Sequence, residues 1–133
     1  MLDYPQVALD FMNRDHAEFV VLRDKLLRLL SAPTPDAGVD TLFDELLEHT
    51  RRHFAEEERL MLETRFPPYP MHKGEHDNVL ADMEMKRGCW RQDRDAAALK
   101  GWLERDVWDW FVNHVGSMDL VTAGFIEMKR KAG

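Results

Sequence analysis

The sequence predicts an all-α protein whose helices form an antiparallel up-down-up-down four-helix bundle, followed by a short C-terminal helix or tail. Three observations predict this fold class. Apolar residues recur at three- and four-residue steps over four long segments, proline-rich or polar stretches separate these segments, and no segment shows the apolar alternation of a strand. Amphipathic helices that are joined by short connections usually pack as antiparallel neighbours.

The length and charge of the chain restrict the classes of protein to which it can belong. Its 133 residues suffice for one domain with a substantial core, so we expect residues 1–133 to form a single domain. The formal net charge of -7 argues against nucleic acid as a partner, because phosphate binding needs a concentrated basic patch. No run approaches the roughly 20 apolar residues of a membrane span. The N-terminus also lacks the features of a signal peptide, and we therefore expect a cytoplasmic protein.

The first helix is expected from about Pro5 to Leu30. Its apolar stripe includes Met12 and Phe19, and His16 lies on the same stripe. The following segment, residues 31–38, contains two prolines and a glycine. Proline lacks an N–H donor and restricts the residue before it, so this segment is the first connection.

The second helix is expected from about Val39 to Arg65 and carries three residues with metal-binding chemistry. His53 and Glu57 are four positions apart, so both side chains leave the same face of the helix. Of the three consecutive glutamates at 56–58, only Glu57 has this offset from His53, and we expect its neighbours to be solvated. His49 lies one turn before His53 on the same face.

The third helix is expected to begin near Met71, after a proline-rich break, and to fade at Arg87 and Gly88. His72 and His76 lie on its inner face. Cys89 then falls in a loop, where we interpret it as an incidental thiol. Two tryptophans, Trp90 and Trp108, lie off the apolar stripes and are expected at the surface or in a subunit contact.

The fourth helix is expected from about Asp95 to Ser117, with His114 on its apolar face. Asp119 follows His114 by five residues, which separates the two side chains by about 140° on a regular α-helix. They can share a face only if the helix loosens or ends between them, and Gly116 lies at that point. Residues 120–133 are expected to form a short helix and a frayed tail with a basic end.

The six histidines all fall on the predicted inward faces of the four helices. A single histidine on an apolar face is usually a hydrogen-bonded structural residue. Five or six that converge with two carboxylates favour a metal site instead. Without a cation, clustered imidazoles would leave donors and acceptors unmatched in a low-dielectric core, and Glu57 would repel Asp119.

The number of candidate ligands indicates two metal ions. Five histidines and two carboxylates exceed what a tetrahedral zinc ion or a single octahedral ion takes from protein. If both carboxylates and one solvent-derived oxygen bridge two ions, three histidines complete six ligands on one ion. Two histidines then leave the other ion with an open position. Imidazole and carboxylate ligation with an open position suits iron, to which O2 can bind.

These residues resemble the ligand pattern of the bacterial hemerythrins over the chain from its first helix almost to its end. The pattern consists of His16, His53-x-x-x-Glu57, His72-x-x-x-His76 and His114-x-x-x-x-Asp119. The resemblance implies a non-heme di-iron centre that binds O2 reversibly, with two Fe ions (Fe2+/Fe3+) and a bridging oxo or hydroxo group.

The resemblance also implies a role for each ligand. His72, His76 and His114 would bind the coordinatively saturated iron, and His16 and His53 would bind the iron with the open position. Glu57 and Asp119 would bridge the two ions. His49 is surplus to this pattern and is either a nearby or alternative ligand or a plain position near the end of the bundle.

The O2 pocket is expected among large apolar residues next to the ligands, where a dry wall would hinder the entry of protons and anions. Each of these residues would also serve as ordinary core packing. The N-terminal arm is short for the family. The expected pocket residues are Phe19, Phe54, Trp110, Phe111 and Val115.

The sequence favours an oxygen carrier that stores O2 or delivers it, for example to an oxygen-consuming enzyme, and that is not itself an enzyme. A di-iron enzyme that handles peroxide or nitric oxide is the first alternative, but the paired Glu-x-x-His motifs of ferritin-like oxidases are absent from the sequence. An O2-sensing module is the second alternative, and such a module would need a separate output protein. We expect a monomer or a weak oligomer.

Overall fold

The computed structural model describes residues 3–33 and 38–133, and all regular secondary structure within these ranges is helical. The all-α fold class is thus confirmed. No helix in these ranges is both long enough and apolar enough to cross a membrane. The elements are α1 (Asp10–Leu30), α2 (Gly38–Glu63), α3 (Tyr69–Asp93), α4 (Ala96–Gly101), the π-helix η1 (Trp102–Val107), α5 (Trp108–His114), the π-helix η2 (Val115–Asp119) and α6 (Leu120–Ala132).

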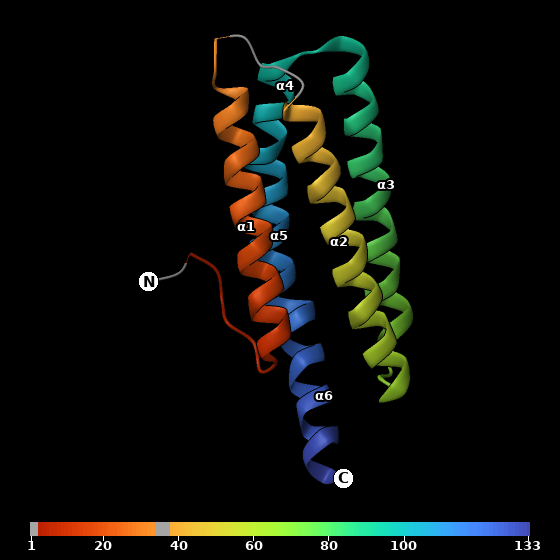
Figure 1. Ribbon diagram of the computed structural model, residues 1–133. Helices are drawn as coiled ribbons and strands as arrows, with labels where there is room; N and C mark the ends of the chain where they lie inside the picture. The colour runs from red at the N-terminus through yellow and green to blue at the C-terminus, as the bar shows by residue number, and fades with distance from the viewer. Residues whose placement is uncertain (1–2, 34–37) are drawn as a thin grey trace.

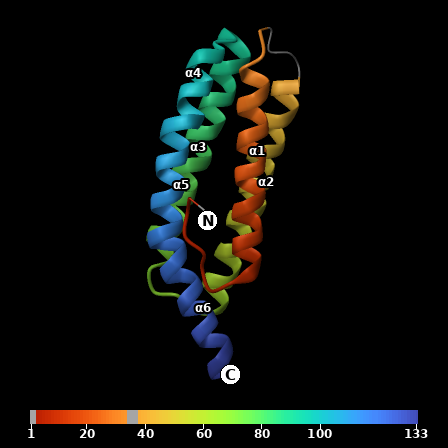
Figure 2. The same ribbon diagram turned by 90° about the vertical axis from the view of Figure 1, so that its left-hand side faces the viewer.

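The helices lie side by side as a bundle (Figure 1). Helix α1 packs against α2, α2 packs against α3, and α4 contacts both α1 and α3. Elements α4 to α6 follow one another without a break and form a single long helical stretch along the bundle. Helix α6 extends beyond the ends of the neighbouring helices (Figures 1 and 2). The middle parts of all four stretches therefore surround one interior.

The N-terminal arm is the first difference from the sequence-based expectation, because α1 begins at Asp10 and not near Pro5. The arm runs back along the bundle between α1 and α5 (Figure 2). The side-chain amide of Asn13 both accepts a hydrogen bond from the N–H of Val7 and donates one to its carbonyl, each at 2.9 Å. These bonds satisfy the backbone N–H and carbonyl of Val7 without a helical turn. The middle of the proline-rich connection, residues 34–37, lies outside the described residues.

The third helix continues past Gly88 to Asp93, where Arg94 adopts the left-handed conformation with φ 51° that ends a helix. Cys89 is therefore an exposed helical residue, and the expected loop at this position was wrong. Trp90 is buried and donates a hydrogen bond from Nε1 to Asp40 at 2.9 Å, so its expected place at the surface was also wrong. Trp108 is half-buried and packs edge-on against Tyr4.

The fourth helical stretch does not end at Ser117 but continues to Ala132. The helix loosens into the π-helix η2 between His114 and Asp119, which is the first of the two alternatives that the five-residue spacing allowed. The expectation of a frayed tail after residue 120 was wrong for most of this segment, because α6 is helical to Ala132. The polar interior described below thus has continuous helices on all its sides.

Candidate metal centre

Seven polar side chains from four parts of the bundle converge in its interior, and each of them is buried. Helix α1 contributes one residue, α2 and α3 contribute two each, α5 contributes one and η2 contributes one. These residues are His16, His53, Glu57, His72, His76, His114 and Asp119. They are the same seven that the sequence singled out as candidate ligands, and the structure brings all of them together.

Helix geometry explains how distant positions reach one interior. The i, i+4 spacing places His53 with Glu57 on one face of α2 and His72 with His76 on one face of α3. His114 and Asp119 share one face although they are five residues apart, because η2 follows the wider i→i+5 pattern of a π-helix. As a result, Nε2 of His114 lies 3.0 Å from Oδ1 of Asp119.

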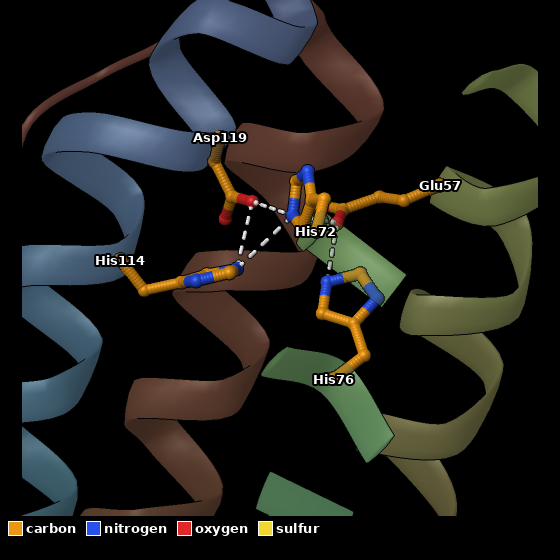
Figure 3. A group of neighbouring side chains, drawn as sticks. All are labelled: Glu57, His72, His76, His114 and Asp119. Carbon is orange, nitrogen blue, oxygen red and sulfur yellow. Dashed lines mark hydrogen bonds and ion pairs between the residues drawn. The ribbon is translucent and has the colours of Figure 1, made fainter. Parts of the chain in front are cut away.

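The first of two groups within this set consists of Glu57, His72, His76, His114 and Asp119 (Figure 3). One potential ligand atom from each lies within 4.8 Å of the others. Nε2 of His76 is 3.2 Å from Oε1 of Glu57, and Nε2 of His72 is 3.1 Å from Oδ1 of Asp119. Three imidazoles and two carboxylates therefore face one point.

The second group consists of His16, His53, Glu57 and Asp119, so the two groups share both carboxylates. Nε2 of His16 lies 3.0 Å from Oδ2 of Asp119, and Nε2 of His53 lies 2.6 Å from Oε2 of Glu57. Each carboxylate thus turns one oxygen toward the first group and its other oxygen toward the second. This is the arrangement that two bridging carboxylates require.

Four of the five histidines also have a polar partner at Nδ1, the ring nitrogen that points away from the cluster. Three of the partners are carboxylates: Asp15 at 2.8 Å from His53, Glu58 at 2.9 Å from His76 and Glu75 at 2.6 Å from His114. The fourth is the hydroxyl of Thr122, at 2.8 Å from His72. Partners of this kind fix the orientation and tautomer of a metal-binding imidazole.

The sequence reasoning missed these outer partners, and the expectation that Glu58 is solvated was wrong, because its carboxylate lies 2.9 Å from Nδ1 of His76. A signal was present, because each of the three acids directly precedes or follows a candidate ligand in the sequence: Asp15 before His16, Glu58 after Glu57 and Glu75 before His76. Each acid then reaches a histidine of the next helix. Adjacent side chains on a helix point about 100° apart, which lets one face the interior and the other the neighbouring helix.

The hydrogen-bond inventory of the cluster fits a cation. An imidazole that donates from Nδ1 to a carboxylate presents a lone pair at Nε2 when it is neutral. These lone pairs face carboxylate oxygens, and Nε2 of His72 lies only 3.3 Å from Nε2 of His114. Within the described residues, both oxygens of Glu57 and Nε2 of His53 and His76 are buried without a hydrogen bond of normal geometry. Positive charge among these atoms satisfies all of them.

The electrostatics of the metal-free cluster show how strongly the two carboxylates depend on positive neighbours. Burial and the Asp119 charge both act to raise the pKa of Glu57, but the charge of His53 and the close polar contacts with His53 and His76, at 2.6 and 3.2 Å, lower this pKa to about 2. Burial also opposes ionisation of Asp119, yet hydrogen bonds from His114, His16 and His72 hold its pKa well below the usual range. The carboxylates are therefore anionic ligands at neutral pH.

A small cavity of about 20 Å³ lies on the His16 and His53 side of the cluster. This volume is enough for one water-sized molecule. The Phe111 ring packs edge-on against the His16 ring, with the two ring centroids 5.6 Å apart, and Phe19 stacks on Phe111. All five residues that the sequence indicated for a pocket line this cavity: Phe19, Phe54, Trp110, Phe111 and Val115.

His49, the sixth histidine, is not part of either group. Its Nε2 lies 3.1 Å from Oε1 of Glu18, and its ring borders both the small cavity and a hollow that opens to solvent. It therefore lies next to the centre and not at a plain position near the end of the bundle.

Comparison with known proteins gives a consistent picture. Residues 7–125 match the family described as hemerythrin HHE cation binding domain. The chain is 33% identical to a bacteriohemerythrin of Aquifex aeolicus over 85% of this chain and 86% of that protein, and 36% identical to a bacteriohemerythrin of Ralstonia nicotianae over 80% of this chain and 73% of that protein. A myohemerythrin of Sipunculus nudus is 32% identical over 60% of this chain and 59% of that protein. No solved structure gives a significant match.

Proposed function

We propose that this chain, which belongs to the hemerythrin family, binds O2 reversibly at a pair of non-heme iron ions in the centre of its bundle. The observation that carries the proposal is the division of seven buried groups into two sets that share Glu57 and Asp119. Iron suits this mixture of imidazole and carboxylate ligands. When bound, the iron pair supplies the electrons that a bound O2 molecule accepts and later returns.

The two groups differ in size, and this difference supports a different role for each. Three histidines and two carboxylates would saturate one iron together with a bridging oxo or hydroxo group. His16 and His53 would leave an open position on the other iron. The cavity of about 20 Å³ lies against these two histidines, which supports placing the O2 position there.

The cavity walls are proposed to protect the bound gas. Phe19, Phe54, Phe111 and Val115 bring no proton donor to the cavity, and Trp110 donates its only N–H to Glu75 at 2.9 Å. On their side of the cavity these residues disfavour the entry of protons and anions, which slows oxidation of the centre, whereas the polar residues Asp15, His49 and Thr50 also border the cavity.

The proposal extends to the organisation of the whole chain. We take residues 1–133 as one hemerythrin-like domain with four helical stretches in up-down-up-down order. The contacts of α1 with α2, α2 with α3, and α4 with both α1 and α3 support this order, as does the view in Figure 1. Carriage, storage and delivery of O2 to an oxygen-consuming enzyme are the proposed roles, and we expect a monomer or a weak oligomer.

The test is to load the protein with iron, reduce it without oxygen and record its absorption spectrum as O2 is added and removed. A spectrum that returns on removal of O2, with two irons per chain, is the expected result. Glu57→Gln should lose both the iron pair and the spectral change. The neighbouring half-buried residue, whose side chain pairs with Arg59 outside the cluster, supplies the matched control, Glu56→Gln, which should behave as the parent protein does.

The alternative functions give different results in the same experiment. Sustained consumption of O2, peroxide or nitric oxide with an electron donor would show a di-iron enzyme and contradict the carrier role. A single zinc ion per chain, or an iron pair that does not respond to O2, would also contradict it.

A further inference from the structure

A third cluster of potential metal ligands lies outside the seven-group centre. It consists of Asp15 and Glu18 of α1 and His49 of α2, and one ligand atom from each lies within 4.8 Å of the others. Asp15 and His49 are half-buried, and Glu18 is exposed. The combination of two carboxylates and one imidazole suits hard or intermediate divalent cations such as Mn2+ and Fe2+.

The cluster lines a hollow of about 620 Å³ between α1 and α2 that is open to solvent. The small cavity of the centre lies directly behind it, because Asp15, His49 and His53 border both spaces. These three side chains therefore lie between the hollow and the cavity beside the centre. Nδ1 of His49 points to no hydrogen-bond partner among the described residues, although the atom is buried.

Asp15 connects the two sites directly. Its Oδ2 accepts a hydrogen bond from Nδ1 of His53, a proposed iron ligand, at 2.8 Å. Its Oδ1 lies 3.7 Å from Nε of Arg14. One carboxylate can thus hold His53 with one oxygen and a cation with the other.

Two basic residues, Arg14 and Arg52, also border the hollow. Both side chains are largely exposed, and Arg52 lies 3.9 Å from Glu48. Exposed charges are screened by water and salt, and long side chains can turn away, so these arginines oppose a bound cation only weakly. They would make binding at this site weaker than binding at the buried centre.

We propose that Asp15, Glu18 and His49 form an entry site that captures Fe2+ from solvent and passes it to the His16 and His53 side of the centre. This inference rests on the proposed iron centre. The transfer is a ligand exchange without a change in oxidation state. Fe2+ leaves Glu18 and His49 and gains His53 and Glu57 as the Asp15 carboxylate keeps its place beside both sites.

Mn2+ is the probe for the entry site. The iron-loaded, oxidised protein is titrated with Mn2+, and free Mn2+ is counted from its electron paramagnetic resonance signal. The parent protein should bind one Mn2+ per chain, and Glu18→Gln and His49→Ala should weaken this binding at least about tenfold. Glu84→Gln is the matched control, because Glu84 is as exposed as Glu18, with 55% against 54%, and also pairs with a basic side chain.

The second measurement is the rate at which metal-free protein takes up Fe2+ without oxygen. Glu18→Gln and His49→Ala should slow uptake several-fold yet reach the same final content of two irons, whereas Glu84→Gln should match the parent. Absence of Mn2+ binding in the parent, or equal uptake rates in all four proteins, would overturn the entry site. If the parent protein holds its iron pair and binds O2, but binds no Mn2+ or takes up Fe2+ at the same rate as the variants, only the entry site is refuted. A parent without an iron pair refutes the proposed function as well.

Discussion

At the residue scale, four of the five histidines proposed as iron ligands are each held at Nδ1 by a second side chain from another helix. Asp15 of α1 binds His53 of α2, Glu58 of α2 binds His76 of α3, and Glu75 of α3 binds His114 of α5. The carboxylates run around the bundle in chain order, so each helix orients a ligand of the next. A partner of this kind raises the basicity of the imidazole and fixes its ring, which strengthens metal binding.

This arrangement predicts the effect of removing one outer carboxylate. Glu58→Ala should weaken iron binding by about 10–100-fold, because His76 loses the partner that orients it. Competition with an iron chelator measures the change. Glu63→Ala, an exposed glutamate of the same helix, should bind iron as the parent does. Equal affinity in the two variants would contradict the role of Glu58.

The pKa shifts of single residues predict how the metal-free protein responds to pH. Burial lowers the pKa of His53, but the Glu57 charge and the hydrogen bonds that His53 donates to Asp15 and Glu57 raise it from 6.5 to about 10. A raised pKa stabilises the folded state below 6.5, and this contribution is lost as the pH rises through about 10. The lowered pKa of Glu57 stabilises the folded state above pH 4.5. This stabilisation is lost as the pH falls from 4.5 through about 2.

The Tm of the metal-free protein should therefore fall when the pH is raised from about 6 to about 9. The Tm of the iron-loaded protein should change less over this interval, because bound metal replaces the protons on the histidines. Calorimetry of both forms measures the difference between the two Tm values, which should widen with pH. A difference that narrows instead would contradict the protonation states assigned to the cluster.

At the element scale, the two features that complete the centre are the π-helix η2 and the N-terminal arm. The π-helix brings Asp119 to the face of His114 although the two are five residues apart. The arm lies between α1 and α5, where Tyr4 packs edge-on against Phe111 with ring centroids 5.2 Å apart. Phe111 in turn borders the proposed O2 position. Both features lie in segments that regular helix periodicity alone does not describe.

Changes in chain length at Gly116 test the role of the π-helix. Deletion of Gly116 shortens the step from His114 to Asp119 to four residues, which share a face on a regular α-helix, so iron binding should persist. Insertion of one alanine after Gly116 should turn Asp119 by about a further 100° and abolish the iron pair. Iron analysis of the two variants, with circular dichroism to verify helicity, makes the comparison. Loss of iron in the deletion variant would contradict this account of η2.

The arm is tested at Tyr4. Tyr4→Ala should reduce the free energy of unfolding by about 2–4 kcal/mol, because a buried ring is lost against Phe111 and Trp108. The same variant should lose bound O2 faster through oxidation, since water gains access to the cavity wall. Tyr4→Phe keeps the ring and should match the parent in both denaturant unfolding and the oxidation rate. An unchanged oxidation rate in Tyr4→Ala would contradict the covering role of the arm.

At the scale of the whole molecule, the proposed metal pair joins all four helical stretches at one point. Glu57 and Asp119 are both buried, and each raises the cost of ionising the other. Cations between them would convert this repulsion into attraction and would connect α1, α2, α3, α5 and η2. The apolar interior lies in the same helices, where Phe43 stacks on Trp102 and where Leu26, Leu46 and Leu103 are fully buried. This apolar core stabilises the bundle independently of the metal.

Removal of iron should therefore lower the stability of the protein without unfolding it at room temperature. A ligand present at 100 times its Kd contributes about 2.7 kcal/mol, so the Tm should fall by at least about 5 °C on removal of iron. His114→Ala should lose iron and show a similarly reduced Tm that added iron does not restore. An identical Tm for iron-loaded parent and His114→Ala would contradict the assignment of His114 as a ligand.

The sequence by itself determined the helical class and the seven candidate ligands, because helix periodicity and the i, i+4 spacing of His53 with Glu57 and of His72 with His76 are local properties of the chain. Only the tertiary structure decided that the stretch from His114 to Asp119 loosens into a π-helix, that Tyr4 covers Phe111, and that Asp15, Glu58 and Glu75 hold histidines of neighbouring helices. These features depend on which residues of different helices face each other, and this is set by packing between elements that lie far apart in the sequence. The same is true of the hollow beside Asp15 and His49, which exists only where α1 and α2 meet.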